Sequence, residues 1–222
     1  MTSISGNASN LLSIGGELDE ETKQQLYTDI YDDSMWLINM VENLLSVTKI
    51  SGEGTKLKKQ EEVVEEIVAE SVAKIQKRFP SSQIRVRVPD ELLLVPMDAM
   101  LIEQVLINLM ENAIRHSGTA KPIYLTVKHL WHHVYFSVLD QGIGIEEERL
   151  PHIFDGTTSS KSSDSSRGLG IGLPICKTII SAHGGEIYAK NNENGGANFT
   201  FVLPMKGEVE HVQQTEDTGC RR

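Results

Sequence analysis

Apolar positions in the first fifty residues recur at helical spacing. Ile4, Ala8 and Leu11 form a short helical stripe that Gly15 interrupts, and a second helix is predicted from near Asp19. Its apolar positions form a heptad seam with a wider apolar flank: Tyr27, Ile30, Ser34, Leu37, Val41, Leu44, Thr48, with Trp36, Ile38, Met40 and Leu45. Two helices cannot bury so wide a surface. This favours a homodimer through a four-helix bundle, and the alternative is packing on the rest of the same chain.

After a glycine-containing linker at 51–55, helical and alternating patterns follow one another. Helices are predicted over 63–75, 98–116 and 174–182, and strands over 84–88, 123–127, 134–138, 186–189 and 199–203. Helices gathered on one side of a mixed sheet give the α+β class, a two-layer α/β sandwich preceded by a helical hairpin. We expect a hairpin at 1–50, a second domain at 56–205, and a polar, disordered tail at 206–222.

Composition narrows the possible partners. The formal net charge of −10 over 222 residues argues against nucleic acid and against anionic membrane surfaces as partners. No apolar run approaches the roughly 20 residues that span a bilayer, and no signal peptide opens the chain. The two cysteines cannot build a disulfide framework. We therefore expect a cytoplasmic location and no membrane contact by these residues.

Polar side chains share one face of the helix predicted over 98–116. Asn108, Asn112 and His116 stand at i, i+4 and i+8, and Arg115 is one position off that line. Carboxamide oxygens are hard ligands that suit Mg²⁺, which takes few protein ligands when it also binds phosphates. Arg115 and His116 could then reach phosphate oxygens. The alternative is a solvated polar face.

Asp140 ends a predicted strand and precedes Gly142 and Gly144. Glycines let the backbone approach a flat ligand closely, and a carboxylate there can accept a hydrogen bond from the adenine amine. A plain turn is the alternative, since Asp-x-Gly is common in turns. The apolar residues Ile143 and Ile145 argue against a solvated turn.

A second glycine-rich loop opens the helix predicted at Pro174. The loop amides of 168–173 and the helix dipole would face an anion, although the loop is neither a Walker nor a convincing Rossmann motif. The serine-rich segment before it carries Lys161 and Arg167 as candidate phosphate contacts. We interpret it as a mobile lid, with an unstructured loop as the alternative.

The remaining histidines and Cys176 have structural interpretations. His129, His132 and His133 surround a predicted hairpin turn and are expected to be incidental exposed groups rather than a metal site. His183 ends a helix, where positive charge is favourable. Cys176 lies on an apolar helix and is expected in the core.

Taken in order, these motifs resemble the Bergerat-type ATP-binding domain of sensor histidine kinases of two-component systems. Segment 108–117 resembles the N box, 140–145 and 168–173 the two glycine boxes, and 149–155 the F box. Residues 1–50 resemble the dimerisation and phosphotransfer hairpin. Segment 94–117 and the closing NNENGGANFTFVLP look most like the KdpD-type potassium-sensing kinases.

The resemblance implies a five-stranded mixed sheet with three helices, binding of ATP with Mg²⁺, and phosphoryl transfer to a histidine and onward to a response regulator receiver domain. It implies Asn112 as the main Mg²⁺ ligand, with Asn108 beside it, and Asp140 as the residue that selects adenine. The implied nucleotide site comprises Asn108, Asn112, Arg115, His116, Asp140, Gly142, Gly144, Lys161, Arg167, Gly168, Leu169, Gly170, Ile171, Gly172 and Leu173. The parent protein is expected in the bacterial inner membrane.

Three positions depart from the family pattern. No histidine precedes His116, so the phosphoacceptor is missing. We expect a chain cut just after the motif that carries it, with a natural fragment as the alternative. Thr157 replaces an aromatic residue of the F box, which puts docking of the lid in doubt. Gly196-Ala197 stands where the last strand often begins with Gly-Ser or Gly-Thr.

Asn108 separates branches of this scaffold. ATPases that resemble gyrase or the Hsp90 chaperones carry a water-activating glutamate there, and asparagine cannot act as that base. A kinase core is therefore favoured over an ATP hydrolase. A non-enzymatic, dimerising nucleotide-binding module is the remaining alternative.

Overall fold

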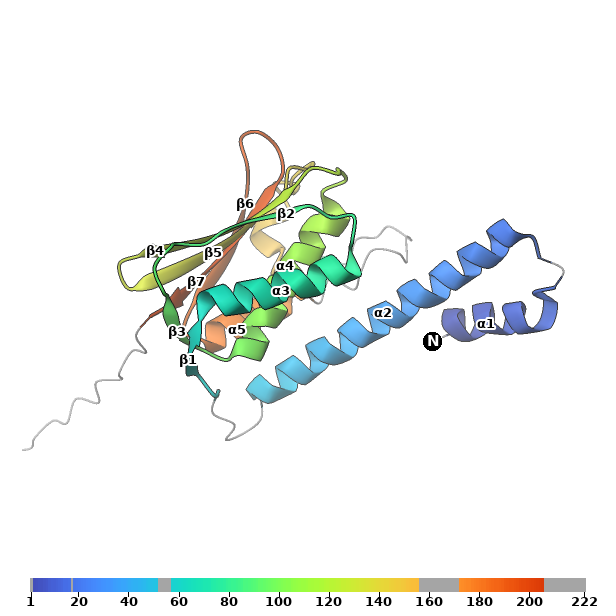
Figure 1. The fold of residues 1–222 in the computed structure, drawn as a ribbon, viewed down its shortest axis with the longest axis horizontal. Helices are drawn as coiled ribbons and strands as arrows, with labels where there is room; N and C mark the ends of the chain where they lie inside the picture. Colours follow the sequence, from blue (N-terminus) through green and yellow to red (C-terminus); the bar gives the residue numbers. More distant parts are fainter. Residues whose placement is uncertain (1, 17, 52–56, 156–171, 206–222) are drawn as a thin grey trace, which may run out of the picture.

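The computed structural model describes residues 2–16, 18–51, 57–155 and 172–205. Figure 1 shows a helical hairpin that extends to one side of a domain in which helices pack on a sheet. The hairpin consists of α1 (Thr2–Ile14) and α2 (Glu20–Ser51), and α2 contacts α5 of the domain.

Local sequence explains where the hairpin helices begin and end. A side chain at Gly15 would lie 2.2 Å from the carbonyl oxygen of Leu11, so a larger residue does not fit this helix end. Asp19 caps α2 by accepting a hydrogen bond from the Thr22 amide at 2.8 Å, and hydrogen bonds from Thr22 lower the pKa of this carboxyl. The prediction of a second helix from near Asp19 is therefore confirmed.

The domain is an α+β sandwich of two layers, as predicted. Its sheet has the strand order β2-β4-β5-β7-β6, with β2 and β4 parallel and the other pairs antiparallel. The strands are β2 (Ile84–Arg87), β4 (Ile123–Leu130), β5 (His133–Leu139), β6 (Glu186–Asn191) and β7 (Ala197–Pro204). The helices α3 (Val64–Arg78), α4 (Ala99–His116) and α5 (Gly172–Ala182) cover one face of the sheet. A short 3₁₀ turn, η1 (Leu150–His152), follows β5.

One element was not predicted. Strands β1 (Gln60–Val63) and β3 (Leu94–Met97) form a separate antiparallel pair, in which Gln60 lies opposite Met97. Each strand has four residues, and they include Glu61, Glu62 and Pro96, although glutamate and proline are uncommon in strands. Pairing between distant segments, rather than local propensity, therefore forms this small sheet.

The core lies between the helices and the inner face of the sheet. Phe136 of β5 and Phe201 of β7 stack with ring centroids 4.5 Å apart. The inward residues predicted for the two neighbouring strands are all buried: Ile123, Leu125, Val127, Val134, Phe136 and Val138. On the outer face, Ser137 donates to Asn198 Oδ1 at 2.6 Å, so polar contacts tie β5 to β7 there.

The turn between β4 and β5 has an unusual composition. Leu130 pairs with His133, so Trp131 and His132 alone form the turn. Trp131 has a φ of +59° and is 90% exposed. Bulky residues rarely adopt this left-handed conformation.

Candidate functional site

Helix α4 carries four of the predicted site residues, Asn108, Asn112, Arg115 and His116. Asp98 caps its start by accepting from the Leu101 amide at 3.2 Å. Its buried stripe contacts the core, as predicted. Asn108 and Asn112 are half-buried on another face, whereas Arg115 and His116 are exposed near its end.

Asn108 lies at the junction of α4 and α5. Its Oδ1 accepts from Gln104 Nε2 at 3.3 Å, one turn earlier on the same helix. A side chain at Gly172, where α5 begins, would lie 3.7 Å from Asn108 Cγ. Burial raises the pKa of the Cys176 thiol to about 12, and a hydrogen bond with Asn108 opposes this shift. The carboxamide is therefore held on two sides, and Cys176 is a neutral core thiol, as predicted.

Asp140 is buried at the end of β5, with 5% of its surface exposed. Its amide donates to the Ala197 carbonyl at 3.0 Å, and its Oδ1 accepts from the Gly142 amide at 2.8 Å. A side chain at Gly196 would lie 2.1 Å from the Asp140 carbonyl oxygen, so only glycine permits this approach. The turn between β6 and β7 thereby holds the backbone of Asp140, while the Gly142 amide holds its carboxylate.

The glycine loop after Asp140 is fastened at both ends. A side chain at Gly142 would lie 2.1 Å from the Ser117 carbonyl oxygen, which places this loop directly against the end of α4. Asn191 accepts from the Ile145 amide at 2.7 Å and donates to the Ile145 carbonyl at 2.6 Å. Ile145 packs on the core, but Ile143 is 89% exposed, so the expectation that both residues avoid solvent was wrong for Ile143.

These contacts place the start of α5, the two asparagines and the loop after Asp140 in sequence along α4. Gly172 lies beside Asn108, and Gly142 lies beside Ser117, nine residues further on. Nine helical residues span roughly 14 Å. Asn112 lies on α4 between these two contacts. The arrangement places carboxamides and a helix start at one end and a buried carboxylate at the other, which suits a ligand with a phosphate end and a base end.

Arg115 lies over an aromatic ring. Its guanidinium carbon is 5.5 Å from the Phe79 centroid, and that of Arg78 is 5.7 Å from the same centroid. Arg78 also forms an ion pair with Glu111. Stacking on Phe79 therefore orients Arg115 at the end of α4, close in sequence to His116.

The segment that resembles the F box is attached to the domain core. Phe154 meets Phe199 edge to face, with centroids 6.3 Å apart. Asp155 accepts a hydrogen bond from Lys177 at 3.1 Å and pairs with His152 at 3.1 Å. The hydrogen bond with His152, and then that with Lys177, lowers the pKa of the Asp155 carboxyl. Leu173 packs against the core. The predicted lid and glycine-loop residues Lys161, Arg167, Gly168, Leu169, Gly170 and Ile171, and Thr157, lie outside the described residues.

His183 is a correction to the sequence analysis. It is buried at the end of α5, and burial lowers its pKa, which opposes the positive charge that was expected to be favourable there. Its Nε2 accepts from the Asp98 amide at 3.0 Å, and its Nδ1 lies 2.7 Å from the Ile179 carbonyl. A neutral ring with hydrogen on Nδ1 satisfies both contacts. His183 therefore joins the end of α5 to the start of α4 without using a positive charge.

Other candidate sites are not supported among the described residues. Within 2–16, 18–51, 57–155 and 172–205, no three His, Cys, Asp or Glu side chains cluster as metal ligands. No helix in the described part of the chain is both long and apolar enough to cross a membrane. His132 and His133 are exposed beside the turn at Trp131, as predicted, whereas the expectation of an incidental exposed group was wrong for His129, which is half-buried and contacts Glu91.

Sequence reasoning missed three residues that support the site: Gln104, Asn191 and Gly196. Gln104 stands four residues before Asn108, and this spacing could have identified it. Asn191 and Gly196 act on residues about fifty positions away in the chain. Only the pairing of β5, β6 and β7 brings them there.

Comparison with known proteins agrees with this geometry. Residues 97–207 match the family described as histidine kinase-, DNA gyrase B- and HSP90-like ATPases. The chain is 47% identical over 208 residues to the sensor protein KdpD of Clostridium acetobutylicum, covering 93% of this chain and 23% of that protein. It is 34% identical over 178 residues to KdpD of Escherichia coli, covering 80% of this chain and 20% of that one. The chain thus spans less than a quarter of the length of these relatives.

Solved structures of histidine kinases are also similar to this chain. The catalytic domain of the histidine kinase ThkA is 31% identical, with a TM-score of 0.60 over 67% of this chain and 97% of that domain. A longer ThkA structure, in complex with the response regulator TrrA, is 28% identical. It has a TM-score of 0.70 over 92% of this chain and 58% of that one.

Proposed function

Because the chain belongs to the family of histidine kinase-, DNA gyrase B- and HSP90-like ATPases, we propose that it is the ATP-binding core of a sensor histidine kinase. The observation that carries the proposal is the arrangement along α4. Gly172 lies against Asn108, and the loop of the buried Asp140 lies against Ser117. A nucleotide can lie along this helix, with its base at Asp140 and its phosphates near Asn108.

Each group has a role that its chemistry supports. Asp140 accepts from the exocyclic amine of adenine, whereas guanine has a carbonyl at that position. Gly142 and Gly144 let the loop after Asp140 pack closely against Ser117 and Asn191, and Gly172 and Leu173 begin a helix whose dipole favours phosphate. Arg115 and His116 are candidate phosphate contacts. We include Lys161, Arg167 and 168–171 in the site on the sequence motif alone.

The side chains on α4 fit Mg²⁺. Asn112, with Asn108 one turn away, offers carboxamide oxygen, and Mg²⁺ accepts few protein ligands when phosphates supply the rest. When bound, the ion neutralises charge on the phosphates. Gln104 orients Asn108 and thereby sets which way its oxygen points.

Asn108 also favours kinase over hydrolase. Amides cannot take a proton from water at neutral pH, so the site lacks the general base that hydrolysis needs at this position. The γ-phosphoryl group would pass to a histidine nitrogen as its bond to ADP breaks and the nitrogen loses a proton. KdpD and ThkA are named sensor protein and histidine kinase, which supports this assignment.

The partners follow from the same proposal. ThkA was solved with a response regulator, and a receiver domain of this class is the proposed acceptor of the phosphoryl group. The apolar side chains exposed on α1 and α2 support a homodimer through the hairpin. We place this part of the protein in the cytoplasm and the parent protein in the bacterial inner membrane, as the resemblance of its motifs to KdpD-type kinases implies.

Nucleotide binding is tested by Asp140→Asn. The exchange preserves shape but presents an NH₂ group where an acceptor is needed. We expect a loss of about 2–3 kcal/mol, or roughly 30- to 150-fold in Kd for Mg-ATP, by titration calorimetry. Asp29→Asn, on α2 of the hairpin, is the control and should bind normally. Equal affinity of the Asp140 variant and the unaltered chain would refute the adenine-binding role.

Transfer is tested with a supplied acceptor. Incubated with labelled ATP, the chain should remain unlabelled but should label an added helix that carries His-Glu-x-x-x-Pro. The label should be lost in acid and survive in alkali, as expected for phosphohistidine. Label on His116 or another histidine of the chain itself would contradict the proposal, as would free phosphate without label on the helix.

A further inference from the structure

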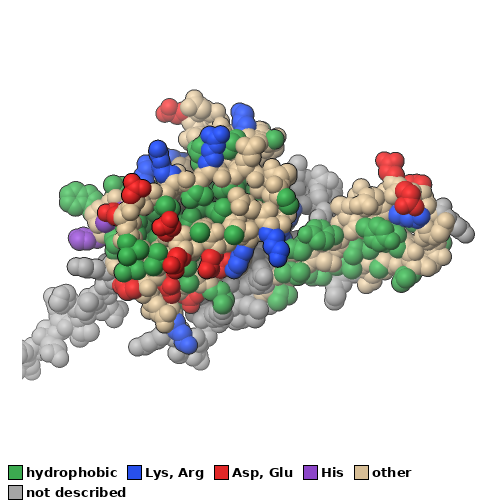
Figure 2. Space-filling view, viewed as in Figure 1, with side chains coloured by type: hydrophobic (Ala, Val, Ile, Leu, Met, Phe, Trp, Pro, Cys, Tyr) green, Lys and Arg blue, Asp and Glu red, His purple; other side chains and the backbone are tan. Residues whose placement is uncertain are grey.

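Apolar side chains gather at the end of the domain far from the nucleotide site. Trp131 is 90% exposed, Leu92 71% and Leu130 50%. We call these three residues, with the crease described below, the tip surface. Strand β5 runs from the Trp131 turn to Asp140, a distance of roughly 20 Å. Figure 2 shows hydrophobic and histidine side chains at this end, beside a row of acidic ones.

The tip surface is braced rather than loose. His129 lies 2.8 Å from Glu91 through Nδ1 and 2.8 Å from the Trp131 carbonyl through Nε2. These contacts fasten the β4–β5 turn to the loop before β3. Trp131 also occupies a left-handed conformation that suits glycine or asparagine better. The backbone carbonyl of Trp131 takes part in this bracing, but its side chain is 90% exposed on a strained turn, and such outliers cluster at functional sites.

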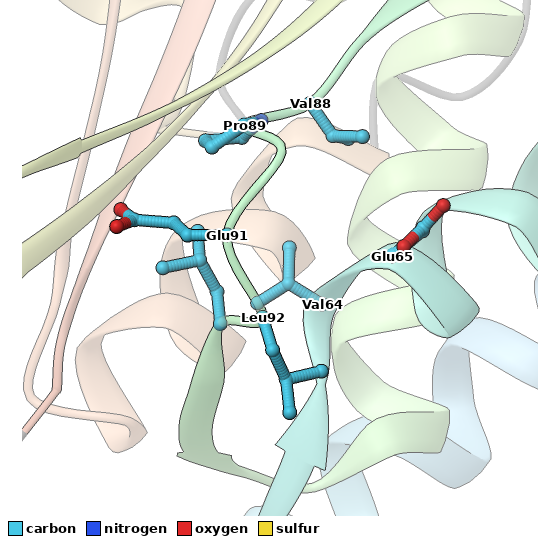
Figure 3. Close-up of a pocket in the computed structure, with 7 residues that line it drawn as sticks. Val64, Glu65, Val88, Pro89, Glu91 and Leu92 are labelled. Atoms are coloured by element: carbon cyan, nitrogen blue, oxygen red, sulfur yellow. The ribbon is translucent and has the colours of Figure 1, made fainter.

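A shallow crease continues the tip surface toward α3. It is lined by Val64, Val88, Pro89, Leu92 and Leu93, with Glu65 and Glu91 at its edges. Figure 3 shows the two carboxylates on opposite sides of the apolar residues. An apolar floor between two acids suits a lysine or arginine side chain, whose stem packs on the floor while its charge meets a carboxylate.

We propose that the tip surface binds a basic, amphipathic segment of a polypeptide partner. Trp131, Leu130 and Leu92 would contact its apolar side, and Glu65, Asp90 and Glu91 would meet its lysines or arginines. Charge decides between this partner and a membrane, since the carboxylates and the net charge of −10 repel anionic lipid headgroups. The site lies apart from Asp140 and from the hairpin, so the proposal is independent of the proposed function.

The direct test uses an 18-residue peptide of alternating leucine and lysine blocks, which lacks tryptophan. In a Trp36→Phe background, Trp131 is the sole tryptophan, so its emission can be excited selectively over that of the five tyrosines. We expect saturable binding with a blue shift of its emission, weakened at least fivefold between 50 and 300 mM salt. The same peptide with glutamate for lysine, and vesicles of phosphatidylcholine and phosphatidylserine, should not shift the emission.

Variants locate the binding by calorimetry. Trp131→Asn removes the ring yet suits the turn, so the fold should be retained and affinity should fall at least tenfold. Leu92→Ala should weaken binding about threefold. Tyr188→Ala, an exposed aromatic residue on β6, is the control and should bind normally. Unchanged affinity in Trp131→Asn, no shift at 1 mM peptide, or an equal response to the vesicles would overturn the proposal.

Discussion

The hairpin and the domain treat their apolar residues in opposite ways. In the domain, helices and sheet enclose a continuous core from Val64 to Leu203. In α1 and α2, none of the described side chains is buried, and Leu12, Tyr27 and Val41 are 89%, 57% and 54% exposed. Figure 2 shows apolar side chains along the hairpin. The domain therefore completes its own core, whereas the hairpin has an apolar surface that this single chain does not cover.

This difference shows what each region needs in order to be stable. The domain's helices are amphipathic, and each buries its apolar face in the core of the same chain. The hairpin has a seam of heptad spacing, and among the described residues α2 contacts α5 of the domain. Stability of the domain should thus be independent of concentration, while that of the hairpin should depend on it.

The largest expected effect would break the proposed hairpin interface. Leu37→Glu places a charge in the half-buried seam of both copies. Each lost leucine is worth about 1.5–3 kcal/mol, and burial of the charge adds to this, so the dimer should dissociate. Analytical ultracentrifugation at micromolar concentration measures it, with Gln24→Glu on an exposed position as the control. ATP binding should survive; a monomeric unaltered chain would refute the dimer.

A substitution in the domain core tests the same difference between the domain and the hairpin. Phe136→Ala removes one of the two stacked rings and should cost the domain about 3–5 kcal/mol of unfolding free energy. Tyr27→Ala in the hairpin should change stability by less than about 0.5 kcal/mol when the protein is dilute. Urea unfolding at two protein concentrations compares them. Equal losses at low concentration would mean that the hairpin shares the domain's core.

The smallest expected effect is a pH dependence confined to the domain. The folded pKa of His183 lies below its ordinary value, so the neutral ring stabilises the fold above about pH 6.5, and this stability falls as pH falls toward the folded pKa. Loss of the bond from Asp98 should cost about 1 kcal/mol. Thermal unfolding from pH 8 to pH 5 should show it.

His183→Gln, which does not titrate in this range, should flatten that part of the profile. His129 should change stability with pH in the opposite direction, because the hydrogen bond with Glu91 raises its pKa. The stability that His129 contributes is therefore lost as pH rises through its folded pKa. His129→Gln is therefore the control. An unchanged acid limb in the His183 variant would show that the histidine is not the titrating group.

Local pattern predicted much of this molecule. The helix around Asn108, the buried strand residues and the α+β class were all visible in spacing, because each depends on neighbours within a few residues. The kinase-like family was visible in four ordered motifs. His183 was misinterpreted because its burial against Asp98 depends on packing between α4 and α5. The β1–β3 pair, Asn191 and Gly196 were missed because their partners are distant in sequence.

The position of β7 in the sheet determines when the nucleotide site can form during synthesis. β7 lies between β5 and β6, and Ala197 accepts the hydrogen bond from the Asp140 amide. A ribosome-bound chain that has emerged only to β6 leaves one edge of β5 without its neighbour and Asp140 without that contact. Such open edges promote association, and pairings between distant segments form slowly. Competence to hold nucleotide should therefore arise late, when the last strand joins the sheet.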